Sequence, residues 1–488
     1  MTLPPWPDLL LLAIPPLWVV GVFLGWHREE RWLVGTIAAV ALAGAVHVAV
    51  GAPRWVLLPL YLFDLGAAFV SALRLGHMPE VRPRWRRVLA RTLMLAAAAL
   101  AVLTPTWILP IPTYEPPTGP YQVGTRAEYW VDSSRAETFT ADPADHRRLM
   151  VQVWYPADPE PENPRVRAHP RPDLLAAGIA GRAAVQTALM GMAGTGLTWA
   201  HADAPMSGAA RTFPLLVFSH GFGGTRFQNG FQMAELASHG YVIVATDHTF
   251  HSTGTVFPGD EIVWPDSLST TLIQQDSAAI RFVNLWAADG RFLIDRMSAL
   301  VRDDPRRLFT GRIDTTRIGY FGHSFGGATA AQIMSLDPRV QAGLNMDGYP
   351  FGTAWEAGLS RPFLELRGDA IDPGAIPEAQ LEAAGSSRAK LQALMDSWGV
   401  RTTTLTRGGG FGVHLAGATH MNFSDSPLWS PALAQPLGLA GPIDSREGHR
   451  LINALVRGFF DRHLKQRPAG VLDSLGQGPY ALLKRTAR

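Results

Sequence analysis

The pentapeptide Gly322–Gly326, Gly-His-Ser-Phe-Gly, constrains the fold of this chain more than any other segment. It lies between an apolar run at 317–321 and a stretch of helix-forming residues at 327–334, so the predicted order is strand, sharp turn and helix. Such a turn is so tight that only glycine fits on either side of the serine, and its strain holds the hydroxyl clear of the backbone. Ser324 is therefore the first candidate for a nucleophile.

A second glycine-rich segment follows an apolar run at 213–219, which predicts a buried strand. The segment begins at His220 and continues as Gly-Phe-Gly-Gly at 221–224. In hydrolases with a serine elbow, a loop at this place supplies one backbone amide to a developing oxyanion, and the residue after the serine supplies another. The N–H groups of Phe222 and Phe325 are the expected donors.

The general base is expected on a loop that follows a late strand. Residues 402–405 and 412–416 are both β-like, and the second run leads into a loop that contains His420. His420 is therefore the candidate base among the 15 histidines. His220 and His323 lie inside the two glycine motifs, where packing or ordering of the loop is the expected role.

The third member of a triad is a carboxylate between the serine and the histidine in chain order. Asp347 directly follows an apolar run at 340–346, which predicts the strand after the elbow helix. Asp369 and Asp372 follow the next predicted strand, at 362–366. The spacing alone leaves both positions open.

Several segments resemble the corresponding motifs of the platelet-activating factor acetylhydrolase family, in its secreted and type II form: 119–125, 217–221, 322–329, 344–351 and 418–425. The resemblance extends over roughly residues 115–465. It implies an α/β-hydrolase fold with a mostly parallel central sheet, and an esterase for short-chain or oxidised acyl esters, including those of phospholipids. It also implies that Ser324 is the nucleophile, His420 the base and Asp347 the acid, without a metal or cofactor.

The first fifth of the chain contains four apolar stretches, at about 9–26, 33–50, 55–73 and 92–111. Each approaches the ~20 residues that cross a bilayer as a helix. They predict a transmembrane region of four spans over 1–114, followed by a catalytic domain over 115–488. His47 and Asp64 fall inside these spans, where a hydrogen bond within the bundle is favoured over a role in transport or sensing.

Arginines are distributed unevenly over the short connectors between these stretches. The connector on one side of the membrane carries Arg54, and the connectors on the other side carry Arg28, Arg31, Arg74, Arg82, Arg84, Arg86, Arg87 and Arg91. Because arginine-rich connectors stay in the cytoplasm, the catalytic domain is expected on the periplasmic or extracellular side. The frequent Ala, Arg, Gly and Pro residues resemble a bacterial composition, so the membrane would be a bacterial inner membrane.

Composition excludes several other classes of protein. The chain has no cysteine, which rules out disulfides, thiolate metal sites and a cysteine nucleophile. Its net charge of +2 comes largely from the arginine-rich connectors, so nothing indicates a nucleic-acid partner.

A mostly apolar insertion at 173–200 precedes the strand of the oxyanion loop. Its composition is compatible with a lid over an acyl pocket or with a lipid-facing surface. It is equally compatible with a packed cap helix.

Three functions follow from these observations. The first is a membrane-anchored serine esterase that acts on a small-molecule or lipid ester. The second is a carboxylesterase for non-lipid esters of the polyester or lactone type, with Asp369 as the acid. The third is a catalytically idle hydrolase domain that serves the helical region as a membrane sensor, and the presence of all three triad residue types makes this the least favoured.

Overall fold

The structure of the chain is a computed structural model, which describes residues 6–50, 55–75, 83–173, 189, 191–272, 276–370, 372–383 and 386–486. The chain divides into two compact units. The first comprises Met1–Thr113 together with Trp429–Leu433, and the second comprises Tyr114–Leu428 and Ala434–Arg488.

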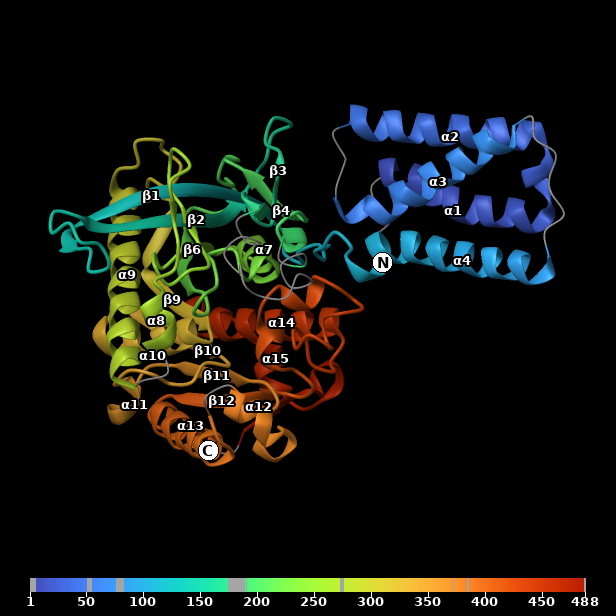
Figure 1. The fold of residues 1–488 in the computed structure, drawn as a ribbon. Helices are drawn as coiled ribbons and strands as arrows, with labels where there is room; N and C mark the ends of the chain where they lie inside the picture. The colour runs from blue at the N-terminus through green and yellow to red at the C-terminus, as the bar shows by residue number, and fades with distance from the viewer. Residues whose placement is uncertain are drawn as a thin grey trace. The chain divides into compact units, whose positions relative to one another are not determined.

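The first unit is helical. Its helices are α1 (Trp6–Leu24), α2 (Glu30–Ala49), α3 (Leu58–Arg74) and α4 (Arg84–Leu103), and a π-helical turn at Thr104–Ile108 continues α4 (Figure 1). Large apolar side chains point outward from them; Leu62 and Phe69, for example, are 62% and 64% exposed. Outward apolar side chains on helices suit a hydrocarbon environment, where helices satisfy their own backbone hydrogen bonds.

Three of these helical segments are long and apolar enough to cross a membrane: Trp6–Leu24, Glu30–Ala49 and Arg84–Ile108. The third expected span, at 55–73, corresponds to α3, which has only 17 residues. At 1.5 Å per residue it rises about 25 Å, short of the ~30 Å hydrocarbon core. A fourth span thus remains a prediction that depends on the 3₁₀ turn Trp55–Leu57, which leads directly into α3.

Polar side chains are buried inside the helical unit. His47 Nε2 lies 3.1 Å from Asp8 Oδ1, and the hydroxyl of Tyr61 lies 3.1 Å from His47 Nδ1. The carboxylate oxygens of Asp64 are buried and have no hydrogen-bond partner among the described residues. His47 thus has the hydrogen bonds that the sequence favours, whereas the described residues provide none for Asp64.

The second unit is built on one large sheet. Within the described residues its strand order is β13-β12-β11-β10-β9-β5-β6-β2-β1-β4-β3. Neighbouring strands from β6 through β5, β9, β10 and β11 to β12 are all parallel. The strands are β1 (Gln122–Ala136), β2 (His146–Ala157), β3 (Arg165–Arg167), β4 (Leu197–Ala202), β5 (Phe213–Ser219), β6 (Val242–Thr246), β9 (Ile313–His323), β10 (Val340–Met346), β11 (Phe363–Arg367), β12 (Gly410–Leu415) and β13 (Leu483–Arg485).

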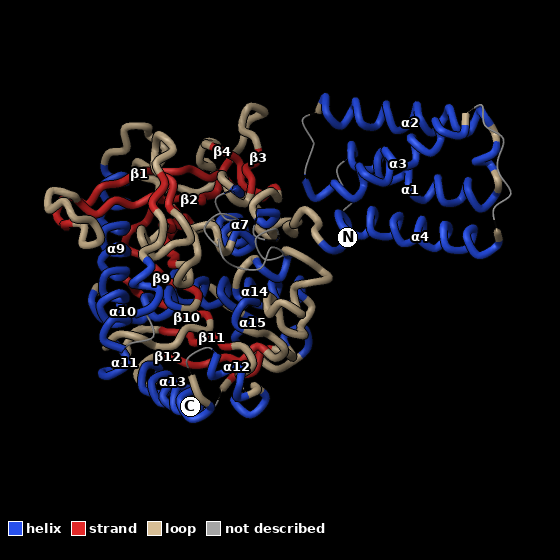
Figure 2. Tube along the Cα trace, viewed as in Figure 1, coloured by secondary structure: helices blue, strands red, loops and turns tan. Residues whose placement is uncertain are grey.

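Helices cover both faces of this sheet, so the predicted α/β architecture with a mostly parallel sheet is confirmed. Figure 2 shows α9 and α10 on one side of the strands and α7 and α14 on the other. Every residue of β5 is buried, as expected for a parallel strand that is covered on both faces. The helices are α7 (Gly230–Ser238), α8 (Ser267–Leu272), α9 (Asp276–Arg302), α10 (Phe325–Leu336), α11 (Ala354–Ala357), α12 (Glu378–Ala383), α13 (Arg388–Thr406), α14 (Ser445–Leu464) and α15 (Gly470–Asp473), and a small ribbon pairs β7 (Thr255–Val256) with β8 (Ile262–Val263).

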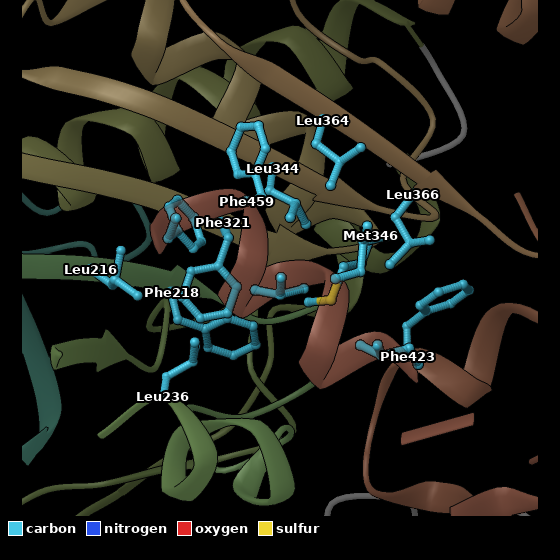
Figure 3. Packing of buried hydrophobic residues seen from close by; sticks show 14 of the residues in the cluster. Leu216, Phe218, Leu236, Phe321, Leu344, Met346, Leu364, Leu366, Phe423 and Phe459 are labelled. Atoms are coloured by element: carbon cyan, nitrogen blue, oxygen red, sulfur yellow. The ribbon is translucent and has the colours of Figure 1, made fainter. Parts of the chain in front are cut away.

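Alternate residues of the central strands enter two separate cores. On one face Phe218, Phe321 and Leu344 pack with side chains of α7 and α14, such as Leu236 and Phe459 (Figure 3). The other face packs against α9 and α10. Full burial of each such side chain contributes about 1.5–3 kcal/mol. The two cores together hold the carboxyl ends of the central strands in fixed register.

One local expectation is wrong. Residues 402–405, which are β-like in sequence, form the last turns of α13. Threonine favours strands because of its branched Cβ, but here Thr404 Oγ1 donates to Val400 O and Thr406 Oγ1 to Thr402 O, four residues back. Leu405 is also fully buried in the core beside α9 and α10. Tertiary packing thus overrides the local preference.

The apolar insertion expected at 173–200 lies mostly outside the described residues. Its described end contributes β4, which pairs in parallel with β1.

Candidate active site

Ser324 lies in the turn between β9 and α10 with a backbone φ of 56° and ψ of −121°. This conformation is strained for a residue with a side chain, and strain of this kind is concentrated at functional sites. A Cβ on Gly322 would lie 2.3 Å from the backbone of Gly326, and one on Gly326 would lie 2.0 Å from Ser219 O. Both flanking glycines are therefore required by close backbone contact.

A continuous hydrogen-bonded chain joins Ser324, His420 and Asp347. His420 Nε2 lies 3.0 Å from Ser324 Oγ, and His420 Nδ1 lies 2.8 Å from Asp347 Oδ2. His420 begins the 3₁₀ turn that follows β12, and its side chain is 45% exposed. The serine and histidine are thus accessible from outside the protein, while Asp347 lies behind them.

The environment of Asp347 keeps it ionised. Burial would raise the pKa of this carboxyl, but the hydrogen bond and charge of His420, with the N–H of Gly368, bring the pKa below its usual value. Gly368 N donates to Asp347 Oδ1 at 3.0 Å, and the backbone N–H of Asp347 donates to Leu366 O. The backbone of β11 thus positions an acid that follows β10.

The other two acid candidates have different partners. Asp369 Oδ1 lies 2.8 Å from His414 Nε2, and Asp369 Oδ2 accepts from Gly417 N. Asp372 accepts from Gly374 N at the start of a 3₁₀ turn. The structure therefore brings Asp347, rather than Asp369 or Asp372, to His420.

The two expected oxyanion donors belong to two segments that meet at the serine. Phe222 follows β5, and Phe325 is the first residue of α10, whose N-terminus adds a favourable dipole for negative charge. A Cβ on Gly221 would lie 3.3 Å from Ser324 Cβ, so this loop directly contacts the elbow. No hydrogen bond within the described protein occupies the N–H of Phe222 or Phe325. Both N–H groups are free to donate to an external oxygen.

His323 supports the base rather than reacting itself. Its Nε2–H donates to the backbone carbonyl of His420 at 2.9 Å, and its Nδ1 accepts from Gln228 Nε2 at 2.6 Å. Burial lowers the pKa of His323 to about 3, so the ring is neutral. The same Gln228 accepts from Gly221 N through Oε1. Gln228 therefore links the oxyanion loop to the histidine turn, and no motif in the sequence marks it.

A second Ser-His-Asp set lies beneath the oxyanion loop. Ser219 Oγ is 3.0 Å from His248 Nε2, and His248 Nδ1 is 2.9 Å from Asp289 Oδ2. These three residues are 0–1% exposed, so no substrate can reach them. Arg147 also donates to both oxygens of Asp289, which compensates the buried charge. This set is a buried hydrogen-bonded network under the site. In the part of the chain that the structure describes, no group of three or more His, Asp or Glu side chains could hold a metal ion.

Comparisons with known proteins point to one family of hydrolases. Residues 111–262 and 304–369 match the family model of platelet-activating factor acetylhydrolase, isoform II, and these ranges include Ser324 and Asp347 but not His420. This chain is related to the platelet-activating factor acetylhydrolases. The acetylhydrolase of Cavia porcellus is 22% identical over 271 residues, which cover 52% of this chain and 58% of the relative. This chain therefore spans little more than half of that acetylhydrolase.

Two further similar proteins are named as esterases. A probable 1-alkyl-2-acetylglycerophosphocholine esterase of Arthroderma benhamiae is 27% identical over 267 residues, covering 51% of this chain and 63% of the relative. A solved ferulic acid esterase of Streptomyces cinnamoneus is 28% identical with a TM-score of 0.61, covering 78% of this chain and 100% of that one. The α/β-hydrolase fold that the family resemblance implies is thus confirmed.

Proposed function

We propose that this chain is a membrane-anchored serine ester hydrolase. The observation that carries the proposal is the hydrogen-bonded chain from Ser324 through His420 to Asp347, with contacts of 3.0 and 2.8 Å, at a strained turn between strand and helix. Nucleophile, base and orienting carboxylate within hydrogen-bond reach of one another are the requirement for acyl transfer.

The hydrogen bonds define a proton path. Because Asp347 is a carboxylate and only accepts, His420 carries its proton on Nδ1, and Nε2 is free to accept the proton of Ser324. In the proposed reaction Ser324 Oγ attacks the ester carbonyl while Nε2 takes this proton. The resulting imidazolium then protonates the leaving alcohol, and an acyl-enzyme forms. Water hydrolyses that intermediate by the same path in reverse.

Negative charge develops on the carbonyl oxygen in both halves of this reaction. The N–H groups of Phe222 and Phe325 are the proposed donors, because both are unoccupied and both belong to segments that meet at the serine. Each donor of this kind lowers the barrier by about 3 kcal/mol. The oxyanion loop at Gly221 is therefore nearly as important to the rate as the triad.

The proposed substrates are short-chain or oxidised acyl esters, including those of phospholipids. Two features support this class: the relationship to acetylhydrolases that are named for platelet-activating factor, and three apolar helices that suit a membrane. With the arginine-rich connectors in the cytoplasm, the catalytic unit would act on envelope lipids or external esters. This orientation requires four spans, with α3 as one of them.

A carboxylesterase for non-lipid esters is the second candidate. Similarity to a ferulic acid esterase over the whole of that chain favours it. This candidate does not require Asp369 as the acid, since Asp369 pairs with His414. The two candidate functions therefore differ in the acyl and alcohol groups of the ester substrate, whereas both use the same triad. An idle domain is disfavoured, because a strained elbow and two unoccupied amides would have no use in it.

The test is covalent labelling and turnover by the full chain in detergent. Wild type should react with a fluorophosphonate probe and hydrolyse p-nitrophenyl esters, fastest at short chain lengths, whereas Ser324→Ala should do neither. An sn-2 acetyl phospholipid and a feruloyl ester, compared at equal concentration, distinguish the two substrate classes. Ser335→Ala, at the far end of α10, serves as the matched control and should react like wild type. Full labelling of Ser324→Ala would refute the assignment.

A further inference from the structure

A cross-strand row of four residues lies directly beneath the proposed triad. Gly322 on β9 pairs with Asn345 on β10, Asn345 pairs with Glu365 on β11, and Glu365 pairs with Gly412 on β12. Gly322 and Asn345 each lie two positions before a member of the proposed triad. Side chains of paired residues point to the same face of a sheet, so Asn345 and Glu365 are neighbours under the acid.

Asn345 holds the turn that carries Asp347. Its Oδ1 accepts from Gly348 N at 2.9 Å, and its Nδ2 donates to Gly348 O at 2.7 Å. The side-chain amide therefore fixes both backbone groups of the residue after the acid. Asp347 itself has a φ of 54°, a conformation that a non-glycine residue keeps only when its surroundings impose it.

The same amide also contacts the elbow of the nucleophile. A Cβ on Gly327, in the first turn of α10, would lie 1.7 Å from Asn345 Oδ1. A Cβ on Gly348 would lie 2.0 Å from Ser324 O. The turn of the acid and the turn of the serine are therefore packed against each other with Asn345 between them.

Glu365 completes this arrangement from the neighbouring strand. Its Oε2 accepts the remaining proton of Asn345 Nδ2 at 2.9 Å. Its Oε1 is buried without a hydrogen-bond partner among the described residues, and the whole side chain is 0% exposed. A carboxylate in such a place would be an under-compensated buried charge, so the neutral acid is favoured. Burial raises the pKa of Glu365 to about 8, against the lowering effects of Asn345 and Arg367.

We propose that Asn345 and protonated Glu365 form a buried pair that positions Asp347, and that ionisation of Glu365 disables this positioning. The inference deepens the proposed function and rests on it, because it assigns a role relative to the triad. Ionised Glu365 would draw the amide of Asn345 away from Gly348 O and add a second negative charge near Asp347. Both residues are positioning residues and touch no substrate.

Among the residues that the structure describes, few charged groups face Asn345 and Glu365. Arg367, on the same strand, and Asp347, at the end of β10, are the charges that act on Glu365. β9 and β12 present Gly322 and Gly412 at the paired positions, and α10 presents Gly327 to Asn345. Asp347 is already ionised, so Glu365 is the group in this row that changes charge near pH 8.

The first experiment follows the rate of fluorophosphonate labelling against pH, with the full chain in detergent. Wild type should lose reactivity above pH 8, to about a tenth at pH 9, where one molecule in about ten keeps the proton. Glu365→Gln keeps an acceptor for Asn345 and stays neutral, so it should match wild type at pH 7 and exceed it about tenfold at pH 9. Asn345→Asp cannot donate to Gly348 O in its ionised form, and should lower kcat about 10²-fold with KM unchanged.

The second experiment does not depend on activity. A group whose pKa is raised on folding binds more protons in the folded than in the unfolded state, so stability falls as pH rises between the two values. For Glu365 this window runs from the ordinary glutamate pKa of 4.5 to the raised pKa of about 8. Glu365 therefore contributes a fall in the midpoint of thermal unfolding as pH rises over this window, and adding Glu365→Gln to Ser324→Ala should remove that contribution, so that the midpoint of the double variant falls less, or rises more, with pH.

A matched control is Gln152→Leu, which removes a buried amide that donates to Thr125 on the distant strand β1. It should lower stability without altering either pH profile. If labelling depends on Ser324 but Glu365→Gln still loses reactivity above pH 8, this inference is overturned while the proposed function stands. An absence of labelling in wild type at every pH would overturn the proposed function instead, and an unchanged unfolding slope in Glu365→Gln would show that Glu365 does not ionise in this range.

Discussion

The Nδ1–H of His220 donates to the carbonyl oxygen of Gly221 at 2.7 Å, and this carbonyl belongs to the same peptide as the N–H of Phe222. The other ring nitrogen accepts from the backbone N–H of His248 and lies 3.0 Å from Ser252 Oγ. These bonds fix a neutral tautomer. Hydrogen bonds in series polarise one another, so His220 should strengthen Phe222 as an oxyanion donor.

Loss of this contact should affect the transition state more than substrate binding. We expect His220→Ala to lower kcat about tenfold or more, within the range of a weakened oxyanion donor, with little change in KM. Steady-state kinetics on a short p-nitrophenyl ester measure both constants. His146→Ala, an exposed histidine at the start of β2, is the control and should behave as wild type. An equal loss in both variants would argue against the role of His220.

Replacing the proposed acid should separate the two sequence candidates. Asp347→Asn leaves His420 without its carboxylate and should reduce kcat by about 10⁴-fold through loss of the correct tautomer. Asp369→Asn should change kcat less than about threefold, because Asp369 contacts His414 rather than His420. The comparison of kcat/KM for the two folded variants shows which aspartate is the acid. The reverse order would make Asp369 the acid.

Buried neutral histidines should make the catalytic unit sensitive to acid. Burial lowers the pKa of His248, His251 and His323 to about 3 each. Their unfolded value is near 6.5, so the unfolded chain binds more protons between pH 6.5 and about 3, and stability falls as pH drops through this window. His251→Gln can still accept from Trp286 Nε1 and should reduce the slope of the unfolding midpoint against pH. A slope equal to that of wild type would exclude His251 as a contributor.

Membrane topology should distinguish three spans from four. With α3 as a span, a reporter that is active only outside the cytoplasm should be active when fused after Pro120 and inactive in the connector at 82–87. With three spans α4 still separates these two sites, but the connector at 28–31 then lies on the opposite side from the connector at 82–87, so the same reporter placed at 28–31 distinguishes three spans from four. A silent fusion after Pro120, with an active cytoplasmic reporter at the same place, would move the catalytic unit into the cytoplasm and make cytosolic esters the substrates.

The elbow and its strands could be predicted because their signals are local. The pentapeptide at 322–326 needs only its flanking strand and helix to be recognised, and β10 begins and ends where the apolar run does. The helix at 402–405 was mispredicted, because the core that buries Leu405 cannot be seen in a window of a few residues. The register between β10 and β11 is equally invisible in the sequence.

The supporting residues of the site depend on that register. Gln228 lies on the loop after β5 and meets His323 from β9 only in the folded sheet. Asn345 and Glu365 are adjacent because two strands pair at these positions. Asparagine and glutamate are common residue types, and nothing in the sequence marks these two. Only the strand pairing shows that they share a hydrogen bond.

The strand β13 closes one edge of the sheet with only three residues, paired antiparallel with β12. Exposed strand edges recruit other chains, and short charged strands discourage this. Lys484 and Arg485 supply those charges here, while Leu483 is fully buried. Proteolysis between α15 and β13 would therefore uncover Val413 and Leu415 on an unpaired strand next to the turn of His420. The unpaired edge of β12 would then pair with other molecules and cause aggregation. An affinity tag or a truncation at the carboxyl terminus carries the same risk.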